Sequence, residues 1–60
     1  MQITDFVNDQ DLLLGRLVEQ ADGNATFVDM EDGGEYDVKR ITRAFGQTLI
    51  ITWNGYAYTL

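Results

Sequence analysis

Carboxylates are the only abundant side chains in this sequence that could take part in chemistry. The chain has ten Asp and Glu residues among 60, and it contains no cysteine, no histidine and no serine. The usual activated nucleophiles, the histidine proton shuttle and the common zinc ligands are therefore missing. A carboxylate pair could still catalyse proton transfer, but a chain this short has little room for the concave pocket that would desolvate it. We therefore predict that the protein is not an enzyme and uses no cofactor.

The densest group of carboxylates surrounds a pair of glycines. Calcium loops place their acids in an Asp-x-Asp-x-Asp-Gly pattern with a distal glutamate, and the spacing here differs, so we predict no metal site. Two interpretations remain, a solvated face of a sheet and a patch that binds a basic partner protein. The five acids lie within nine positions, with no basic residue among them: Asp29, Glu31, Asp32, Glu35 and Asp37.

Basic residues are few and clustered. Lys39, Arg40 and Arg43 hold three of the four positive charges. They could form a small anion or phosphate contact. They could equally offset the neighbouring acids through cross-strand ion pairs, each worth about 0.2–1 kcal/mol at a surface.

The last fourteen residues have the pattern of a β-hairpin. Two runs rich in β-branched and aromatic residues flank Asn54-Gly55, a pair favoured in two-residue type I′ turns. Counting back from that turn pairs Trp53 with Tyr56 and Ile51 with Tyr58, which predicts that these aromatic residues lie in the core rather than in a binding platform. The same register puts Ile50 on the opposite face. Ile50 and the unpaired terminal edge are therefore a candidate interface for strand addition.

Three further strands are predicted before the hairpin, at residues 12–20, 25–31 and 35–41, separated by the turn signals Asp22-Gly23-Asn24 and Asp32-Gly33-Gly34. With three-residue turns, Val18, Val28 and Val38 line up on one face as core. Gly15 suggests a bulge or sharp bend that lets Leu12 and Leu14 share a face with Leu17. Residues 42–46 are expected to form a single helical turn or a kink, anchored by Phe45.

The first eleven residues leave two interpretations open. Ile3, Phe6 and Val7 have the spacing of a helix face, which predicts a short helical or irregular segment to about Gln10. Continued, the spacing predicts one amphipathic helix over residues 4–21. Asn8, which forms helices poorly, and the other polar residues and glycine inside it disfavour the long helix.

These elements predict one mainly β domain over residues 1–60, a five-stranded antiparallel meander closing into a small barrel. In strand order and length it resembles the SH3-like and Sm-like barrels, and the latter often carry a short N-terminal helix. No family motif accompanies the resemblance, so it implies no functional residues. The alternative is an α+β fold, with one helix at 4–21 packed on a four-stranded meander.

The formal charge of −6 repels nucleic acid and anionic membranes on average and attracts basic partners. No apolar run reaches membrane-spanning length and no signal sequence is recognised, so we expect a cytoplasmic protein. The leading hypothesis is a non-catalytic protein-binding module. In a specific form it is an acidic inhibitor that occupies the basic nucleic-acid-binding surface of an enzyme, as a virus-encoded counter-defence protein would in the host cytoplasm. The alternatives are an Sm-like homo-oligomer that binds RNA or a nucleotide through the basic cluster, and a structural subunit of a larger assembly.

Overall fold

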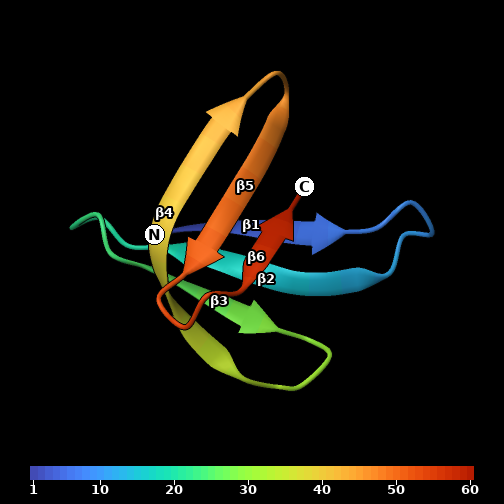
Figure 1. Ribbon diagram of the computed structural model, residues 1–60, viewed down its shortest axis with the longest axis horizontal. Helices are drawn as coiled ribbons and strands as arrows, with labels where there is room; N and C mark the ends of the chain where they lie inside the picture. Colours follow the sequence, from blue (N-terminus) through green and yellow to red (C-terminus); the bar gives the residue numbers. More distant parts are fainter.

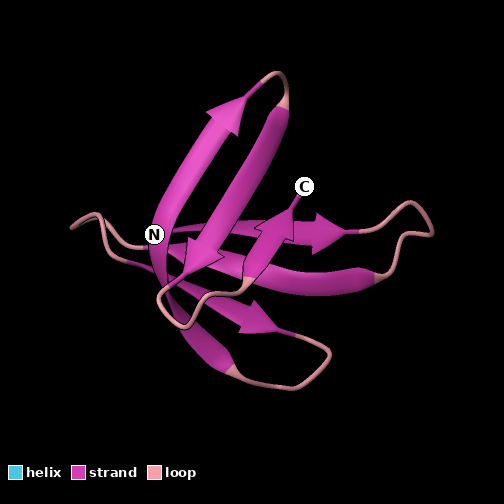
Figure 2. Ribbon diagram, in the orientation of Figure 1, coloured by secondary structure: helices cyan, strands magenta, loops and turns pink.

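The computed structural model describes all 60 residues, and it consists of strands and turns without a helix (Figures 1 and 2). Six antiparallel strands follow one another in a single meander that curls into a half-barrel. The mainly β fold class is therefore confirmed, with six strands in place of five. The strands are β1 (Gln2–Val7), β2 (Leu13–Glu19), β3 (Ala25–Asp29), β4 (Glu35–Ala44), β5 (Gln47–Thr52) and β6 (Ala57–Thr59).

The extra strand lies at the N-terminus, where both helical interpretations are wrong. β1 pairs with β2 along its whole length, and Phe6 enters the core while Val7 stays exposed, as alternation in a strand requires. The side chain of Asn8 stops the strand, because its Oδ1 accepts hydrogen bonds from the backbone N–H groups of Gln10 (2.8 Å) and Leu12 (3.1 Å). The apolar residues have a helix-like spacing only because they lie on both faces of the strand.

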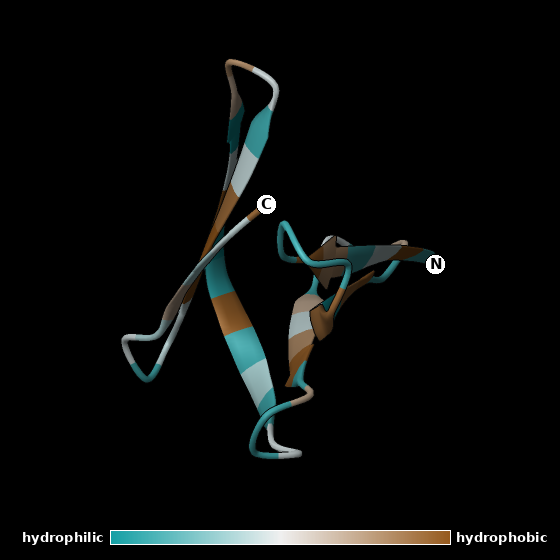
Figure 3. Cartoon of the chain, turned by 90° about the vertical axis from the view of Figure 1, so that its right-hand side faces the viewer, coloured by the Kyte–Doolittle hydropathy of each residue, from teal (hydrophilic) through white to brown (hydrophobic).

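β4 bends and so divides the sheet into two layers that face each other (Figure 3). Its register shifts between Val38 and Arg40, so that its first part pairs with β3 and its second part with β5. A bulge of this kind increases local twist and turns the strand. We call residues 1–37, which hold β1 to β3 and the start of β4, the N-terminal layer. Residues 38–60, with the rest of β4, β5 and β6, are the C-terminal layer.

The core lies between the layers and is small. Its four fully buried apolar side chains are Phe6, Leu17, Phe27 and Ile50, each 0–1% exposed. Phe27 is at the centre, because its ring meets Phe6 edge to face at 5.3 Å between centroids and stacks on Tyr58 at 4.0 Å. Burying one such side chain contributes about 1.5–3 kcal/mol to stability. The two layers are therefore joined mainly through contacts between a few large side chains.

The last hairpin has a register one residue away from the predicted one. Ile50, not Ile51, lies opposite Tyr58. The loop has three residues rather than two, since Thr52 N donates to Tyr56 O (2.9 Å) and Gly55 N donates to Thr52 O (3.0 Å). A shift of one residue exchanges the two faces of a strand. The expectation that Ile50 faces solvent is therefore wrong, as it is fully buried.

The buried side chain of Thr52 favours the longer loop. It is 1% exposed, and its hydroxyl donates to the side chain of Asn54 and accepts from Tyr56 N at 3.0 Å. Gly55 then takes a φ of +91°, the left-handed position that follows a type I turn in three-residue hairpin loops. The two-residue hairpin turn occurs instead at Phe45-Gly46, so the expected helical turn at residues 42–46 is wrong.

The predicted row of three valines does not form. Val18 lies opposite Thr26, and Val28 lies opposite Glu35, both on the outer face of the N-terminal layer, whereas Val38 packs against the core. The reason is loop length. The β3–β4 loop closes with Asp29 N donating to Gly34 O at 2.9 Å, which makes it one residue longer than predicted and reverses the faces of β4.

The predicted irregularity at Gly15 is confirmed, and it makes room for Phe27. Phe6 lies opposite Gly15 while Val7 lies opposite Leu13, so Leu14 is an extra residue in β2. A Cβ on Gly15 would lie 2.3 Å from Cζ of Phe27 and 2.7 Å from the carbonyl oxygen of Val28. The bulge does not bring the leucines inside, because Leu12 and Leu14 remain exposed.

We expect Gly15→Ala to destabilise the protein by about 3 kcal/mol, because the central ring of the core must move and backbone blocks the other side. Urea unfolding followed by circular dichroism measures the change. Gly55→Ala is the control, since nothing lies within 4 Å of its Cβ and only the positive φ opposes it, a cost of about 1 kcal/mol. Equal losses for the two variants would contradict the close packing of Phe27 on Gly15.

Candidate functional site

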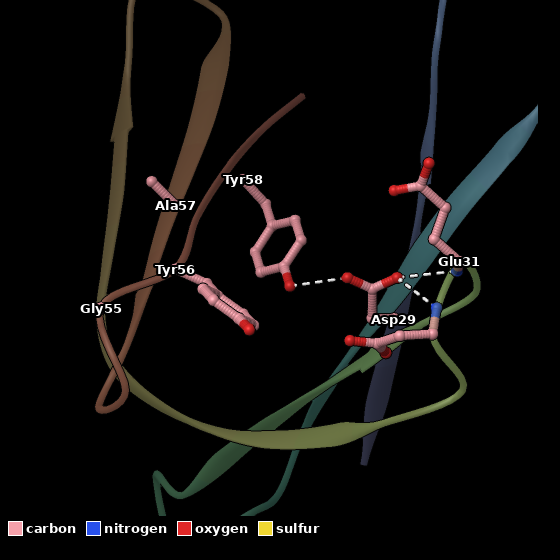
Figure 4. A pocket seen from close by; sticks show the side chains of 7 residues that line it. Asp29, Glu31, Gly55, Tyr56, Ala57 and Tyr58 are labelled. Atoms are coloured by element: carbon pink, nitrogen blue, oxygen red, sulfur yellow. Dashed lines mark hydrogen bonds between the residues drawn. The ribbon is translucent and has the colours of Figure 1, made fainter.

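A hollow of about 420 Å³ opens between the β3–β4 loop and the last hairpin (Figure 4). Carboxylates from the N-terminal layer border one side, and tyrosines from the C-terminal layer border the other. The hollow therefore brings sequence-predicted acidic residues and aromatic residues to one place. The hollow is lined by Asp29, Glu31, Asp32, Gly55, Tyr56, Ala57 and Tyr58.

Asp29 is buried at the back of this hollow and organises the loop. It was expected in a solvated patch, which is wrong, because it is only 8% exposed and shares the inner face with Phe27. Its Oδ2 accepts a hydrogen bond from the hydroxyl of Tyr58 at 2.8 Å, and its Oδ1 accepts one from the backbone N–H of Glu31 at 2.7 Å. Asp29 therefore holds the loop to β6.

Hydrogen bonding fixes the protonation states of this pair. The hydrogen bond from Tyr58 lowers the pKa of Asp29, burial works against it, and the backbone N–H groups of Glu31 and Asp32 add to the lowering. Burial, followed by the hydrogen bond to Asp29, raises the pKa of Tyr58 well above its ordinary value of 10.0. At neutral pH the carboxylate is charged and the phenol keeps its proton.

Asp32 holds the far side of the same loop. Its Oδ1 accepts from Gly34 N at 2.7 Å, and its other oxygen accepts from the hydroxyl of Tyr36. This hydrogen bond is the main reason why the pKa of Tyr36 rises to about 12. The ring of Tyr36 in turn meets Tyr56 edge to face, with centroids 5.0 Å apart. The loop is therefore fixed at both ends by carboxylate–tyrosine pairs.

The remaining acids of the cluster are free of such bonds. Glu31 and Glu35 are exposed and form no hydrogen bond or ion pair through their side chains. Asp37 is exposed on the outer face of β4, opposite Thr26, away from the hollow. No group of three acids lies close enough together to hold a metal ion. The five acids thus divide into two that build the loop and three that face solvent.

The three basic residues do not gather at one point. Arg43 reaches across the two layers to form an ion pair with Glu19. Lys39 lies over the ring of Trp53, with Nζ 5.3 Å from the centroid. Arg40 lies opposite Ile51 on the outer face of the C-terminal layer. None of them forms an ion pair with the acidic loop, so the predicted cross-strand ion pairs with the neighbouring acids are not formed.

The aromatic residues of the last hairpin are split by the corrected register. Tyr58 packs against the core, as predicted. Trp53 and Tyr56 are 68% and 46% exposed, so the prediction that they are buried is wrong. The sequence is compatible with the observed register, because Gly55 suits the third position of a three-residue loop as well as the second position of a two-residue loop.

Charge is divided unequally between the layers, which the net charge of the whole chain does not reveal. Residues 1–37 contain all ten acids and one base, Arg16, which gives 1 − 10 = −9. Residues 38–60 contain three bases and no acid, which gives +3, and the two values sum to the total of −6. The hollow lies at the boundary, with its acidic side in the N-terminal layer. The electrostatic field there favours a cationic ligand.

Comparison with known protein families, with curated protein sequences and with solved structures finds no match for this chain. The structure also contains no helix of the length and apolar character that crossing a membrane requires. The site must therefore be interpreted from its own geometry.

We expect Tyr58→Phe to destabilise the fold by about 1–3 kcal/mol, because it leaves the buried carboxylate of Asp29 without its main partner. Urea unfolding at neutral pH measures the loss. Tyr36→Phe is the matched control, as it removes a hydroxyl from an exposed hydrogen bond, and we expect a smaller loss. A larger loss for Tyr36→Phe would contradict the central place of the Tyr58–Asp29 pair.

The lowered pKa of Asp29 also predicts an acid limb in the stability profile. The unfolded chain, with the ordinary pKa of 3.8, binds the proton more readily than the folded chain. The stabilisation is therefore fully present above the unfolded pKa and is lost as the pH falls through the folded one. Asp29→Asn should flatten this limb in urea unfolding measured across acidic pH. An unaltered limb in Asp29→Asn would refute the assignment.

Proposed function

We propose that the protein is a non-catalytic protein-binding module whose β3–β4 loop binds a basic protein surface. The observation that carries this proposal is the rim of the hollow. There the exposed carboxylate of Glu31 has no partner within the chain, and the exposed ring of Tyr56 borders the opposite side of the hollow (Figure 4). Glu35, at the start of β4, adds a second free carboxylate outside the hollow, on the outer face opposite Val28. The N-terminal layer, with its net charge of −9, supplies the longer-range attraction.

The chemistry of the rim suits arginine or lysine side chains. A guanidinium group can stack on a tyrosine ring while its N–H groups donate to a carboxylate, and the hollow combines both kinds of group. The loop is already fixed by Asp29 and Asp32, so little conformational freedom would be lost on binding. A fixed loop that holds carboxylates across the hollow from an aromatic ring supports selective binding of a basic partner better than a mobile acidic tail would.

In its specific form, the proposed partner is an enzyme that holds DNA or RNA in a basic groove. Carboxylates presented at the positions of phosphates would block that groove, and such inhibition would be useful to a virus acting against a host defence enzyme in the host cytoplasm. The rival Sm-like, RNA-binding role has less support. Arg43 is engaged by Glu19 and Lys39 by Trp53, which leaves Arg40 as the only free base of the expected anion site. No observation favours the structural-subunit role specifically.

Two double variants with the same net charge test the proposal. Glu31→Gln with Glu35→Gln removes the free carboxylates of the rim and of the start of β4, and Asp9→Asn with Asp11→Asn removes two exposed acids from the β1–β2 loop. Asparagine suits the positive φ of Asp11, 61°, so the control should fold normally. Each immobilised protein is exposed to a lysate of host cells, and retained proteins are eluted with short duplex DNA.

We expect the wild type and the Asp9/Asp11 variant to retain the same basic nucleic-acid-binding protein, released by DNA and by salt. The Glu31/Glu35 variant should retain it with about tenfold lower affinity or worse. Retention that is equal in all three proteins, or that DNA does not displace, would overturn the proposal. Equal loss in both variants would show that only total charge matters and would remove the site assignment.

A further inference from the structure

The β4–β5 hairpin projects away from the rest of the molecule, and an aromatic residue lies at its tip (Figure 1). Ala44 pairs with Gln47, so the turn consists of Phe45 and Gly46 alone. The side chain of Phe45 is completely exposed, at 102% of its reference area. It lies outside the hydrophobic core cluster.

The backbone of Phe45 is also strained. Its φ is +55°, in the left-handed region that non-glycine residues with a bulky side chain rarely adopt. A type I′ turn prefers Asn or Asp at this position, and a left-handed conformation costs other residues about 1–2 kcal/mol. In a 60-residue protein that is a large part of the expected stability. The fold gains nothing from phenylalanine at this position, so its use points to binding.

A shallow hollow of about 270 Å³ lies beside Phe45, on the outer face of the C-terminal layer. Register places Thr42, Leu49 and Thr59 side by side across β4, β5 and β6 on this face. Ala44 and Gln47 complete the hollow next to the tip. The same face therefore carries an apolar knob and, next to it, a groove with a leucine floor bordered by small or uncharged side chains.

Charge indicates which molecule fits this face. Residues 38–60 contain no acid, and of their three bases only Arg40 points outward here, since Arg43 is paired with Glu19 and Lys39 covers Trp53. A two-fold contact through the N-terminal layer would instead bring together two surfaces that each carry a net charge of −9. The outer face of the C-terminal layer is therefore the face through which two copies can meet under a two-fold axis without acidic repulsion.

We propose that two copies of this chain associate through this face, with Phe45 of each copy seated in the groove of the other. A knob and a groove on one face are self-complementary under a two-fold axis, which gives a closed dimer. The tip of the hairpin and the β3–β4 loop lie at opposite ends of the molecule (Figure 1). The dimer would therefore leave both acidic loops free, and it does not depend on the proposed function.

Sedimentation equilibrium of the purified chain tests the proposal with Phe45→Asn and Ala44→Glu. Asparagine suits the turn, so Phe45→Asn should raise the melting temperature while weakening the dimer by about tenfold or more. Ala44→Glu puts a charge in the groove at an exposed position and should also give monomer. The control is Leu12→Asn, which removes another exposed apolar side chain, from the β1–β2 loop, and should leave the dimer intact.

A wild type that remains monomeric up to about 1 mM would overturn the proposal. So would Phe45→Asn and Ala44→Glu variants that associate as the wild type does. An association that about 1 M salt abolishes, and that Glu31→Gln with Glu35→Gln weakens, would be a head-to-tail contact between acidic and basic layers and would also contradict it. Dimerisation that resists salt and is lost in both hairpin variants is the expected result.

Discussion

Tyr58 joins the two layers, and the rest of the structure depends on it. Its ring stacks on Phe27 in the centre of the core, and its hydroxyl binds the buried carboxylate of Asp29. Both partners belong to β3, whereas Tyr58 belongs to the short last strand. Phe27 can occupy its place only because residue 15 lacks a side chain. With four fully buried apolar residues, the protein has few other contacts that could replace this one.

The same interaction connects the core to the candidate site. Asp29 uses one carboxylate oxygen for Tyr58 and the other for the backbone of the β3–β4 loop. The loop that presents Glu31 to solvent is therefore held by a group that the core itself fixes in place. In the C-terminal layer, the buried and the exposed large apolar side chains lie far apart along β4 and β5. There Ile50 is buried in the core. Phe45 is exposed on a strained turn and does not pack against the core.

The sequence was sufficient to predict a mainly β meander, the strand that became β2, the irregularity at Gly15 and the acidic cluster at the β3–β4 turn. Local patterns could not decide between two-residue and three-residue loops at Asn54-Gly55, and that single residue reversed the roles of Ile50 and Trp53. The burial of Asp29 depends on a tyrosine 29 positions away, which no local pattern indicates. The change from an acidic to a basic composition after residue 37 can be read from the sequence, but the net charge of the whole chain does not reveal it.

The most direct test of the link between the layers is native-state hydrogen exchange. If Tyr58 makes the two layers one cooperative unit, the most protected amides of β2, β3 and β5 should exchange with the same free energy, equal to that of global unfolding. Protected amides in β5 that exchange through a smaller opening, while those of β2 and β3 stay protected, would show that the C-terminal layer opens independently. That result would contradict the central role of Tyr58 and its partners on β3 in holding the two layers together.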